Sequence, residues 1–501
     1  MSAPAPEREA DTRHSVRAAL ASPKRLRVEV LAGLVVAIAL IPEAIAFSII
    51  AGVDPRVGLF SSFVMAVVIA FTGGRPAMIT AATGAIALVV APVSREYGLD
   101  YLLATVILGG ILQLVLALVG VAKLMRFIPR SVMVGFVNSL AILIFLAQVP
   151  YMVDVPWLVY PMIVAGLVIM VALPKITNVV PAPLVALVAL TIVTVAFALT
   201  VPDVGDEGEL PDSLPYLLIP NVPLNLETLQ IIAPYALGLA LVGLMESLMT
   251  AKLVDDITDT HSDKSREGRG QGIANIASGF FGGMGGCAMI GQTMINVKAS
   301  GARTRISTFL SGVFLLVLVV GMGDLVAIIP MAALVAVMII VAVSTFDWHS
   351  VHPSTLRRMP KSETFVMVST VVVVVITHNL AIGVIAGVLV AMVMFARRVA
   401  HFMQVDVVPQ DDPGVKVYKV RGELFFASSN DLVYQFDYSG DPDTVVIDMS
   451  ESHIWDASTV AALDAIETKY ASRDKVVDIQ GLNDASLERH RRLAGHLGGG
   501  H

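Results

Sequence analysis

Two carboxyl side chains stand in apolar stretches of a chain that is otherwise poor in charge. Glu43 lies in the run Leu40-Ile41-Pro42-Glu43-Ala44-Ile45-Ala46-Phe47, and Glu246 lies in the stretch 228–254 with Thr250 four residues later. Residues four apart share one face of a helix, and acidic groups inside a membrane usually serve a function. Because burial favours the neutral form of a carboxyl, either group can carry a proton. Alternatively, Glu43 snorkels to the interface beside Pro42, and Glu246 and Thr250 supply two oxygen ligands to Na⁺.

Two short, glycine-introduced stretches, Gly73–Gly84 and Gly282–Thr293, occupy similar places in two halves of the chain. We expect each to enter the bilayer as an extended segment and to start a helix near Thr83 or Cys287. The first backbone N–H groups of a helix are unpaired and carry about half a positive charge of macrodipole. Two such helix starts that face one another inside a membrane form an anion site without lysine. The simpler role for Thr83 is an N-cap.

The composition is that of a membrane protein. The 501 residues are 56% hydrophobic and 15% charged, against about 25% charged in an average soluble domain. We therefore expect the lipid bilayer, and not nucleic acid, as the partner surface. The single cysteine, Cys287, excludes an intramolecular disulfide. The polar segment 1–27 has no short apolar core before a cleavage site, so we expect no removable signal peptide.

Apolar stretches long enough to cross or enter a bilayer fall into two sets of about seven. The first set comprises 28–50, 56–72, 82–94, 101–122, 130–149, 156–173 and 179–201. The second comprises 228–254, 270–281, 287–298, 304–323, 325–346, 363–378 and 380–398. Leu102–Ala122 and Leu325–Phe346 are uncharged and long enough to span alone, whereas 82–94 and 287–298 are too short. The sequence thus predicts an α-helical polytopic protein with about 14 transmembrane segments.

The loop charges give the orientation. Basic residues follow the even-numbered spans: Lys123, Arg126, Arg130, Lys175, Lys264, Arg266, Arg269, Lys298, Arg303, Arg305, Arg357, Arg358, Lys361, Arg397 and Arg398. The longest odd-numbered loop, 202–227, carries six acidic residues and no Lys or Arg. By the positive-inside rule the N-terminus is cytoplasmic and this loop is extracellular. An odd number of spans in each half inverts the second half relative to the first, as in carriers whose midplane site alternates between the two sides.

The composition changes after Arg398. Residues 405–490 alternate β-branched runs (415–420, 444–449, 476–479) with helical stretches (458–471, 484–497), which is typical of a small α/β domain. The predicted divisions are therefore an N-terminal segment 1–27, repeat one 28–201, the acidic loop 202–227, repeat two 228–402, the α/β domain 405–490 and a tail 491–501. The loop count predicts a cytoplasmic α/β domain in a multi-pass protein of the plasma membrane.

Three separated motifs resemble one family. The run Leu40–Phe47 with Gly58-Leu59-Phe60, and Gly270-Gln271-Gly272-Ile273-Ala274-Asn275 followed by Gly282-Gly283, look like signatures of the sulfate permease family of anion transporters. Residues 405–490 resemble the STAS domain of those proteins. The resemblance implies seven plus seven inverted segments divided into a core and a gate domain, a homodimer, and transport of a small inorganic or organic anion: sulfate, bicarbonate or a dicarboxylate.

The resemblance also implies site residues. The positions that match the family's substrate site are Glu43, Phe47, Thr83, Gly84, Ala85, Ala288, Met289 and Ile290. Glu246 and Thr250, with Glu43, match the coupling-ion positions. The sequence departs from the family where Gln292 replaces an arginine common in helix ten, and where Gly285, Cys287 and Ile290 replace hydroxyl and proline residues. A plainer role for Gln292, Thr293 and Asn296 is interhelical hydrogen bonding.

The missing arginine bears on mechanism, because Glu43 and Glu246 would repel a dianion unless they are neutralised. We expect proton-coupled symport, with H⁺ favoured over Na⁺ and no cofactor or metal. The alternatives are sodium-coupled symport, anion exchange, a nucleobase permease on the same scaffold, and an anion channel. An enzyme is disfavoured because no metal-spaced cluster and no paired nucleophile and base are apparent. In the α/β domain, Ser458 matches the phosphorylated serine of STAS anti-sigma-factor antagonists, but helix capping by Ser458 is favoured.

Overall fold

The computed structural model describes residues 15–120, 128–176, 181–400, 403–410 and 412–495. The chain divides into two compact units, Met1–Val388 and Leu389–His501, which are described separately. The predictions for 1–14, for Lys123 and Arg126, and for the tail from residue 496 lie outside the described residues.

The first repeat contains a chain of helices that follows the predicted spans closely. Its elements are α2 (Val16–Leu20), α3 (Pro23–Ala51), α4 (Pro55–Thr72), β1 (Thr80–Ala81), α5 (Gly84–Tyr97), α6 (Leu99–Val119), α8 (Arg130–Leu146), the 3₁₀ turn η2 (Val149–Met152), α9 (Val159–Ile176), α10 (Ala182–Ala196) and the 3₁₀ turn η3 (Val204–Glu207). Helix α3 begins at Pro23, five residues before the predicted span, because Pro at the first helical turn needs no hydrogen-bond acceptor.

The second repeat mirrors this order. Its elements are α11 (Leu226–Thr258), α12 (Lys264–Phe280), β2 (Cys287–Ala288), α13 (Ile290–Met294), the π-helical turn η4 (Ile295–Ala299), α14 (Arg305–Gly321), α15 (Gly323–Ala327), α16 (Met331–Thr345), α17 (Pro353–Arg358), α18 (Lys361–Thr377) and α19 (Leu380–Ala400). The prediction of one span over 325–346 is wrong, because α15 ends before Pro330 and a new helix begins at Met331.

Seven of the described segments are long and apolar enough to cross a membrane: α3, α4, α6, Arg130–Met152, α9, α11 and Leu380–Arg398. Three shorter apolar helices, α10, α14 and α16, stand at predicted span positions. Helix α5 and the α13–η4 segment start inside the protein after a short strand, as the two glycine-introduced stretches predicted.

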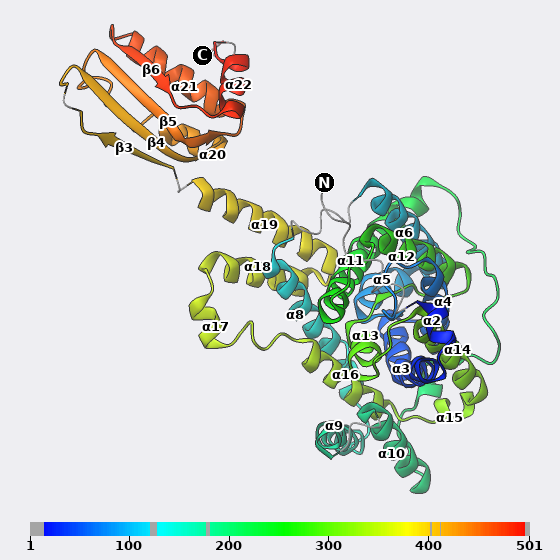
Figure 1. Ribbon diagram of the computed structural model, residues 1–501. Coiled ribbons are helices and arrows are strands. Elements are labelled where there is room, and N and C mark those ends of the chain that lie inside the picture. The colour runs from blue at the N-terminus through cyan, green and yellow to red at the C-terminus, as the bar shows by residue number, and fades with distance from the viewer. Residues whose placement is uncertain (1–14, 121–127, 177–180, 401–402, 411, 496–501) are drawn as a thin grey trace. The chain divides into compact units, whose positions relative to one another are not determined.

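Helices of the two repeats interleave to form a core. Within it, α3, α4 and α6 of the first repeat pack on α11, α12 and α14 of the second, and Figure 1 shows the blue and green helices side by side. Helices α6 and α12 approach closely at Gly110 and Gly272, where a Cβ on either glycine would lie 2.7 Å from the carbonyl oxygen of the other. Small residues that let backbones approach are a common basis of helix association in membranes.

A second group of helices forms the gate. It consists of α8, α9 and α10 of the first repeat with α16 and α18 of the second. The gate meets the core mainly through α16 against α3, α8 against α5 and α10 against α3. The helices that carry the predicted site residues, α3 and α5, therefore lie at the boundary between core and gate.

The second unit contains a four-stranded sheet of order β3-β4-β5-β6, with β3 (Gln404–Val408), β4 (Val415–Leu424), β5 (Thr444–Ile454) and β6 (Val476–Gln480). Strand β3 pairs antiparallel to β4, and the other neighbours are parallel. Helices α20 (Phe426–Leu432), α21 (Ala457–Ala471) and α22 (Asp484–Leu493) pack against the strands. The sequence analysis missed β3 and ended the domain at 490, three residues before the end of α22.

The prediction that Ser458 caps its helix is wrong. The N-cap of α21 is Asp456, whose Oδ1 accepts a hydrogen bond from the Thr459 amide at 3.2 Å. Ser458 lies inside the first turn and is exposed. A carboxylate at the N-cap also complements the helix dipole, which explains why the aspartate takes this position.

Candidate functional site

A two-residue antiparallel pairing brings the two helix starts together in the core. Thr80 pairs with Ala288 and Ala81 with Cys287, so the strands that lead into α5 and α13 run side by side. Helix α5 begins at Gly84 with Thr83 as its N-cap, and Thr83 Oγ1 accepts from the Ile86 amide at 3.4 Å. The second helix begins at Ile290, three residues later than expected, because Cys287 and Ala288 belong to the strand pair.

The strand pairing also decides which amides are free. The Ala288 amide donates to Ser247 Oγ at 3.1 Å, and the Met289 amide donates to the Ile79 carbonyl at 2.9 Å. These two amides of the predicted anion site are therefore already used. The first turns of α5 and α13 still leave their leading amides without a backbone acceptor, as every helix start does. The donors that remain at the predicted positions are those of Gly84, Ala85 and Ile290.

A chain of three side chains links the first helix start to the buried acid on α11. Thr83 Oγ1 lies 3.0 Å from Cys287 Sγ, and Cys287 Sγ donates to Glu246 Oε2 at 2.9 Å. Cys287 and Thr83 are buried and Glu246 is partly buried. Thr250 lies one turn further on α11, and its hydroxyl donates to the Glu246 backbone carbonyl at 2.8 Å. The sequence analysis recognised the other three positions but did not assign Cys287 to the site.

The second acid, Glu43, contacts Gln292, the residue that replaces the arginine common in helix ten of the family. Gln292 Nε2 on α13 donates to Glu43 Oε1 on α3 at 2.6 Å, and both residues are buried. Four residues after Glu43, Phe47 lies against Gly84, where a Cβ would be 2.9 Å from Phe47 Cε1. The structure thus places Glu43, Phe47 and Gln292 beside the same two helix starts. The contact of Gln292 with an acid was not foreseen.

The site has acids but no nearby basic partner. Among the described residues, neither Glu43 nor Glu246 forms an ion pair with Lys, Arg or His; each accepts from a neutral donor. No group of three His, Cys, Asp or Glu in the described part of the chain could hold a metal ion. Unpaired charges buried in protein are strongly disfavoured. No Lys, Arg or His among the described residues therefore compensates either acid with a full positive charge.

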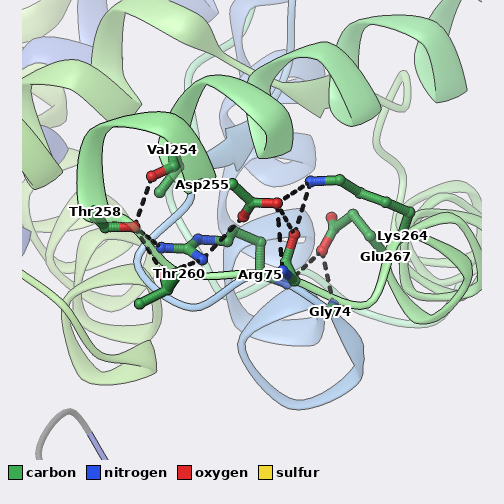
Figure 2. Close-up of polar contacts among 9 residues, drawn as sticks. Gly74, Arg75, Val254, Asp255, Thr258, Thr260, Lys264 and Glu267 are labelled. Carbon is green, nitrogen blue, oxygen red and sulfur yellow. Dashed lines mark hydrogen bonds and ion pairs between the residues drawn. The ribbon is translucent and has the colours of Figure 1, made fainter. Parts of the chain in front are cut away.

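The extended segment before β1 is anchored by charged side chains that sequence reasoning missed (Figure 2). Glu267 at the start of α12 accepts from the amides of Gly74 and Arg75 at 2.7 and 2.9 Å. Arg75 Nη1 donates to Asp255 Oδ1 at 2.9 Å, and Lys264 Nζ lies 2.6 Å from Asp255 Oδ2. We call these four side chains, Arg75, Asp255, Lys264 and Glu267, the ionic anchor.

The segment before β2 is anchored by neutral groups. Asn275 accepts from the Gly286 amide at 2.9 Å and donates to its carbonyl at 3.1 Å, and Ser61 Oγ donates to the Gly285 carbonyl at 2.7 Å. Ser278 Oγ accepts from the Gly285 amide at 3.3 Å. We call Ser61, Asn275 and Ser278 the neutral anchor. The signal that could have found both anchors is the polar stripe of α12, at 267, 271, 275 and 278, which follows helical spacing.

Profiles of two known families match the chain. Residues 26–160 and 152–370 match the sulfate permease family, and residues 406–494 match the STAS domain. YbaR of Bacillus subtilis, provisionally described as a sulfate transporter, is 51% identical over 469 residues that cover 94% of this chain and 97% of YbaR. The bicarbonate transporter BicA of a Picosynechococcus species is 26% identical over 529 residues, covering 94% of this chain and 91% of BicA.

Solved structures show the same fold. Murine Solute Carrier 26 family member A9, an anion transporter in the inward-facing state, superposes with a TM-score of 0.80 at 16% identity over 93% of this chain and 87% of its own. The transmembrane domain of a cyanobacterial BicA superposes with a TM-score of 0.64 at 24% identity, over 73% of this chain and 97% of its own. The chain therefore shares its overall fold with these solved structures.

Proposed function

Because the chain belongs to the sulfate permease family, we propose that it is a secondary active transporter that carries a small anion together with a proton. The relative at 51% identity is provisionally described as a sulfate transporter, so sulfate is the first anion to test. Bicarbonate, which BicA carries by name, is the second, and a dicarboxylate such as fumarate is the third.

The observation that carries this proposal is the Thr83–Cys287–Glu246 chain. It joins the start of α5, where the anion would bind, to an acid that has only a neutral donor. An anion beside the amides of Gly84 and Ala85 raises the cost of a negative charge on Glu246, because like charges at close range repel strongly where water is excluded. Anion binding and protonation of Glu246 would therefore favour one another, which is the requirement for symport.

Glu43 is likewise linked to the second helix start, through its hydrogen bond with Gln292 on α13. An arginine at that position would neutralise the site permanently, whereas an amide can hydrogen-bond to a carboxyl group in either protonation state. The exchange of arginine for Gln292 therefore suits a carrier in which charge balance comes from a proton. Movement of the core against the gate would then expose the site to the two sides in turn.

The direct test is uptake into proteoliposomes of labelled sulfate, bicarbonate and fumarate in parallel. Each anion is offered without a gradient, with an inward proton gradient, and with an inward sodium gradient. We expect one anion to accumulate above equilibrium only with the proton gradient. Accumulation with the sodium gradient alone would replace the proton with Na⁺, and equilibration without either gradient would indicate an exchanger or a channel.

The variant Glu246→Gln locates the coupling site. We expect it to bind and exchange the anion but to lose gradient-driven accumulation, because glutamine mimics the protonated acid and cannot release a proton. Glu227→Gln, at the exposed start of the same helix, is the matched control and should accumulate the anion normally. Full proton-driven accumulation by Glu246→Gln would show that this acid does not carry the proton.

We also propose that the protein is a homodimer of the plasma membrane with the 202–227 loop outside and the STAS unit inside. Because Cys287 is buried, single cysteines can report sidedness. Ser213→Cys on the loop should react with a membrane-impermeant maleimide in intact cells, and His261→Cys on the opposite face should react only after lysis. The reverse pattern would invert the orientation. The mass of the detergent-solubilised protein by light scattering tests the dimer.

A further inference from the structure

A hollow lies between core and gate, away from the two helix starts. It has a volume of about 480 Å³, and its lining includes Asp54, Ser94 and Arg95 of the core together with Tyr151 and Glu207. Arg95 lies twelve residues after Thr83 on α5, which places it about 18 Å further along that helix at 1.5 Å per residue. The hollow therefore sits at the face of the membrane unit that carries the acidic loop.

Arg95 is held in position by the end of α3. Its Nη2 donates to the Ile50 carbonyl at 3.0 Å. The aliphatic part of its side chain lies over Gly52, where a Cβ would be 2.7 Å from Arg95 Cγ. Gly52 has φ +76°, so glycine serves both the turn and the space that Arg95 needs. The bond to Ile50 is the one hydrogen bond of Arg95 within the described part of the chain, so the other N–H donors of the guanidinium group are available to a ligand in the hollow.

Glu207 faces the hollow from the acidic loop. It ends the turn η3, which a reciprocal pair of side-chain to backbone bonds between Asp203 and Asp206 fixes at 3.2 and 3.1 Å. Among the described residues Glu207 has no hydrogen-bond or ion-pair partner. Burial raises the pKa of the Glu207 carboxyl above its ordinary value, and the charge of Asp206 raises it further.

The loop that carries Glu207 is tied to both domains. The Val204 amide donates to the Ile329 carbonyl and the Met331 amide donates to the Pro202 carbonyl, each at 2.9 Å, so one side is fastened beside the start of α16 in the gate. On the other side the Arg56 amide donates to the Glu209 carbonyl at 3.1 Å, and the side chains of Arg56 and Glu209 form an ion pair. The loop segment that carries Glu207 therefore connects the gate to the core.

Several other charged and titratable groups surround Glu207. Asp54 at the start of α4 is paired with Arg56 at 3.4 Å, and Glu209 pairs with the same arginine. The groups that face Glu207 or line the hollow with it are Asp54, Arg95, Tyr151 and Asp206. Arg56 pairs with both Asp54 and Glu209 but carries one positive charge. Among the residues that line the hollow, Arg95 is therefore the cation that faces the acids Asp54 and Glu207.

We propose that this hollow is an outer binding site for the transported anion, in which the Arg95 guanidinium group holds the anion and the Glu207 carboxylate opposes it until Glu207 is protonated. The inference rests on the proposed function, since it names where the anion waits before it reaches the helix starts. It assigns Arg95 as a binding residue and Glu207 as a determinant of the pH at which the anion enters.

The test measures exchange of the labelled anion that the uptake assay identifies, with equal pH on both sides of the proteoliposome membrane. For the native chain we expect KM to be low at acidic pH and to rise as the pH passes through the pKa of Glu207, because the ionised carboxylate repels the anion. In Glu207→Gln this rise should be clearly smaller, and the part that remains belongs to the acids of the central site. In Arg95→Gln the KM should rise about tenfold with kcat within about twofold, which matches the loss of a hydrogen bond to a charged group.

Two controls separate these effects from a loss of structure or of coupling. Asp212→Asn removes an exposed acid of the same loop that does not line the hollow, and it should leave the KM profile unchanged. Exchange at equal anion concentrations needs no net proton flux, so it tests the hollow even if gradient-driven uptake fails and the symport proposal falls. The inference is overturned if Arg95→Gln leaves KM unchanged, or if Glu207→Gln keeps the pH dependence of the native chain.

Discussion

The extended segments before β1 and before β2 are both held in place by side chains, but those side chains are charged in the first case and neutral in the second. The segment before β1 is held by the ionic anchor, in which Glu267 binds two backbone amides and Arg75 binds Asp255 (Figure 2). The segment before β2 is held by the neutral anchor, in which Asn275 binds both backbone groups of Gly286. One helix, α12, supplies both, because Glu267 and Asn275 lie eight residues apart on the same face.

The difference follows from where the two segments lie. The ionic anchor stands among the basic loops predicted to face the cytoplasm. The side chains of its Lys264–Asp255 pair keep 30% and 13% exposure, whereas Glu267 is buried and accepts from two backbone amides. The side chains of the neutral anchor are fully buried. An ion pair with access to water has a modest desolvation cost, whereas the same pair in the deep interior costs several kcal/mol for each ion. Amides and hydroxyls are therefore the better choice for the deeper segment.

The largest predicted effect comes from removing the centre of the ionic anchor. Glu267→Ala leaves the amides of Gly74 and Arg75 without acceptors and deprives Gln271 of its 2.9 Å bond. We expect a loss of about 3–5 kcal/mol in unfolding free energy, because three buried donors lose a charged acceptor, seen as a lower melting temperature in detergent and as loss of transport. Glu267→Gln keeps one acceptor oxygen and should lose less. Equal losses for the two variants would show that the charge is unimportant.

The matching change in the neutral anchor should cost less. Asn275→Ala removes the bonds to Gly286 and a 2.9 Å bond to Gln113 Oε1, but these partners lose a neutral group and not a charged one. We expect about 2 kcal/mol from unsatisfied neutral groups. The melting temperatures of Asn275→Ala and Glu267→Ala, measured side by side, test the comparison directly. A neutral-anchor variant that melts below the ionic-anchor variant would contradict it.

A double-mutant cycle on Arg75 and Asp255 separates their mutual interaction from their other contacts. Arg75 also donates to Thr258 and Thr260, and Asp255 also binds Lys264. We expect a coupling in unfolding free energy of about 1–2 kcal/mol between Arg75→Met and Asp255→Asn, as for partly buried groups in one network. Strict additivity of the two melting shifts would mean that the ion pair itself stabilises nothing.

The smallest effect is predicted for the most exposed member of the ionic anchor. Lys264→Gln should change the unfolding free energy by about 0.5 kcal/mol, because exposed ion pairs gain little after solvent screening. Raising the salt concentration should reduce even this difference between the variant and the native chain. A melting shift as large as that of Asn275→Ala would show that Lys264 is structurally central.

The sequence allowed much of the fold to be predicted because its signals are local. The apolar spans, the two short entry stretches and the α/β character of the last hundred residues follow from hydropathy and periodicity. Span boundaries were wrong where proline intervened, as at Pro330, and strand β3 was missed. The acids Glu43 and Glu246 were recognised because carboxyl groups in apolar runs are conspicuous.

The sequence by itself determined the membrane class, the inverted arrangement and the presence of two helix starts without lysine, since each depends only on the order of apolar, small and charged residues. Only the tertiary structure decided which side chains meet. The contact of Cys287 with Glu246 and that of Gln292 with Glu43 join residues 41 and 249 positions apart. Distant pairings of this kind depend on how helices of the two repeats pack, and no local pattern in the chain records that.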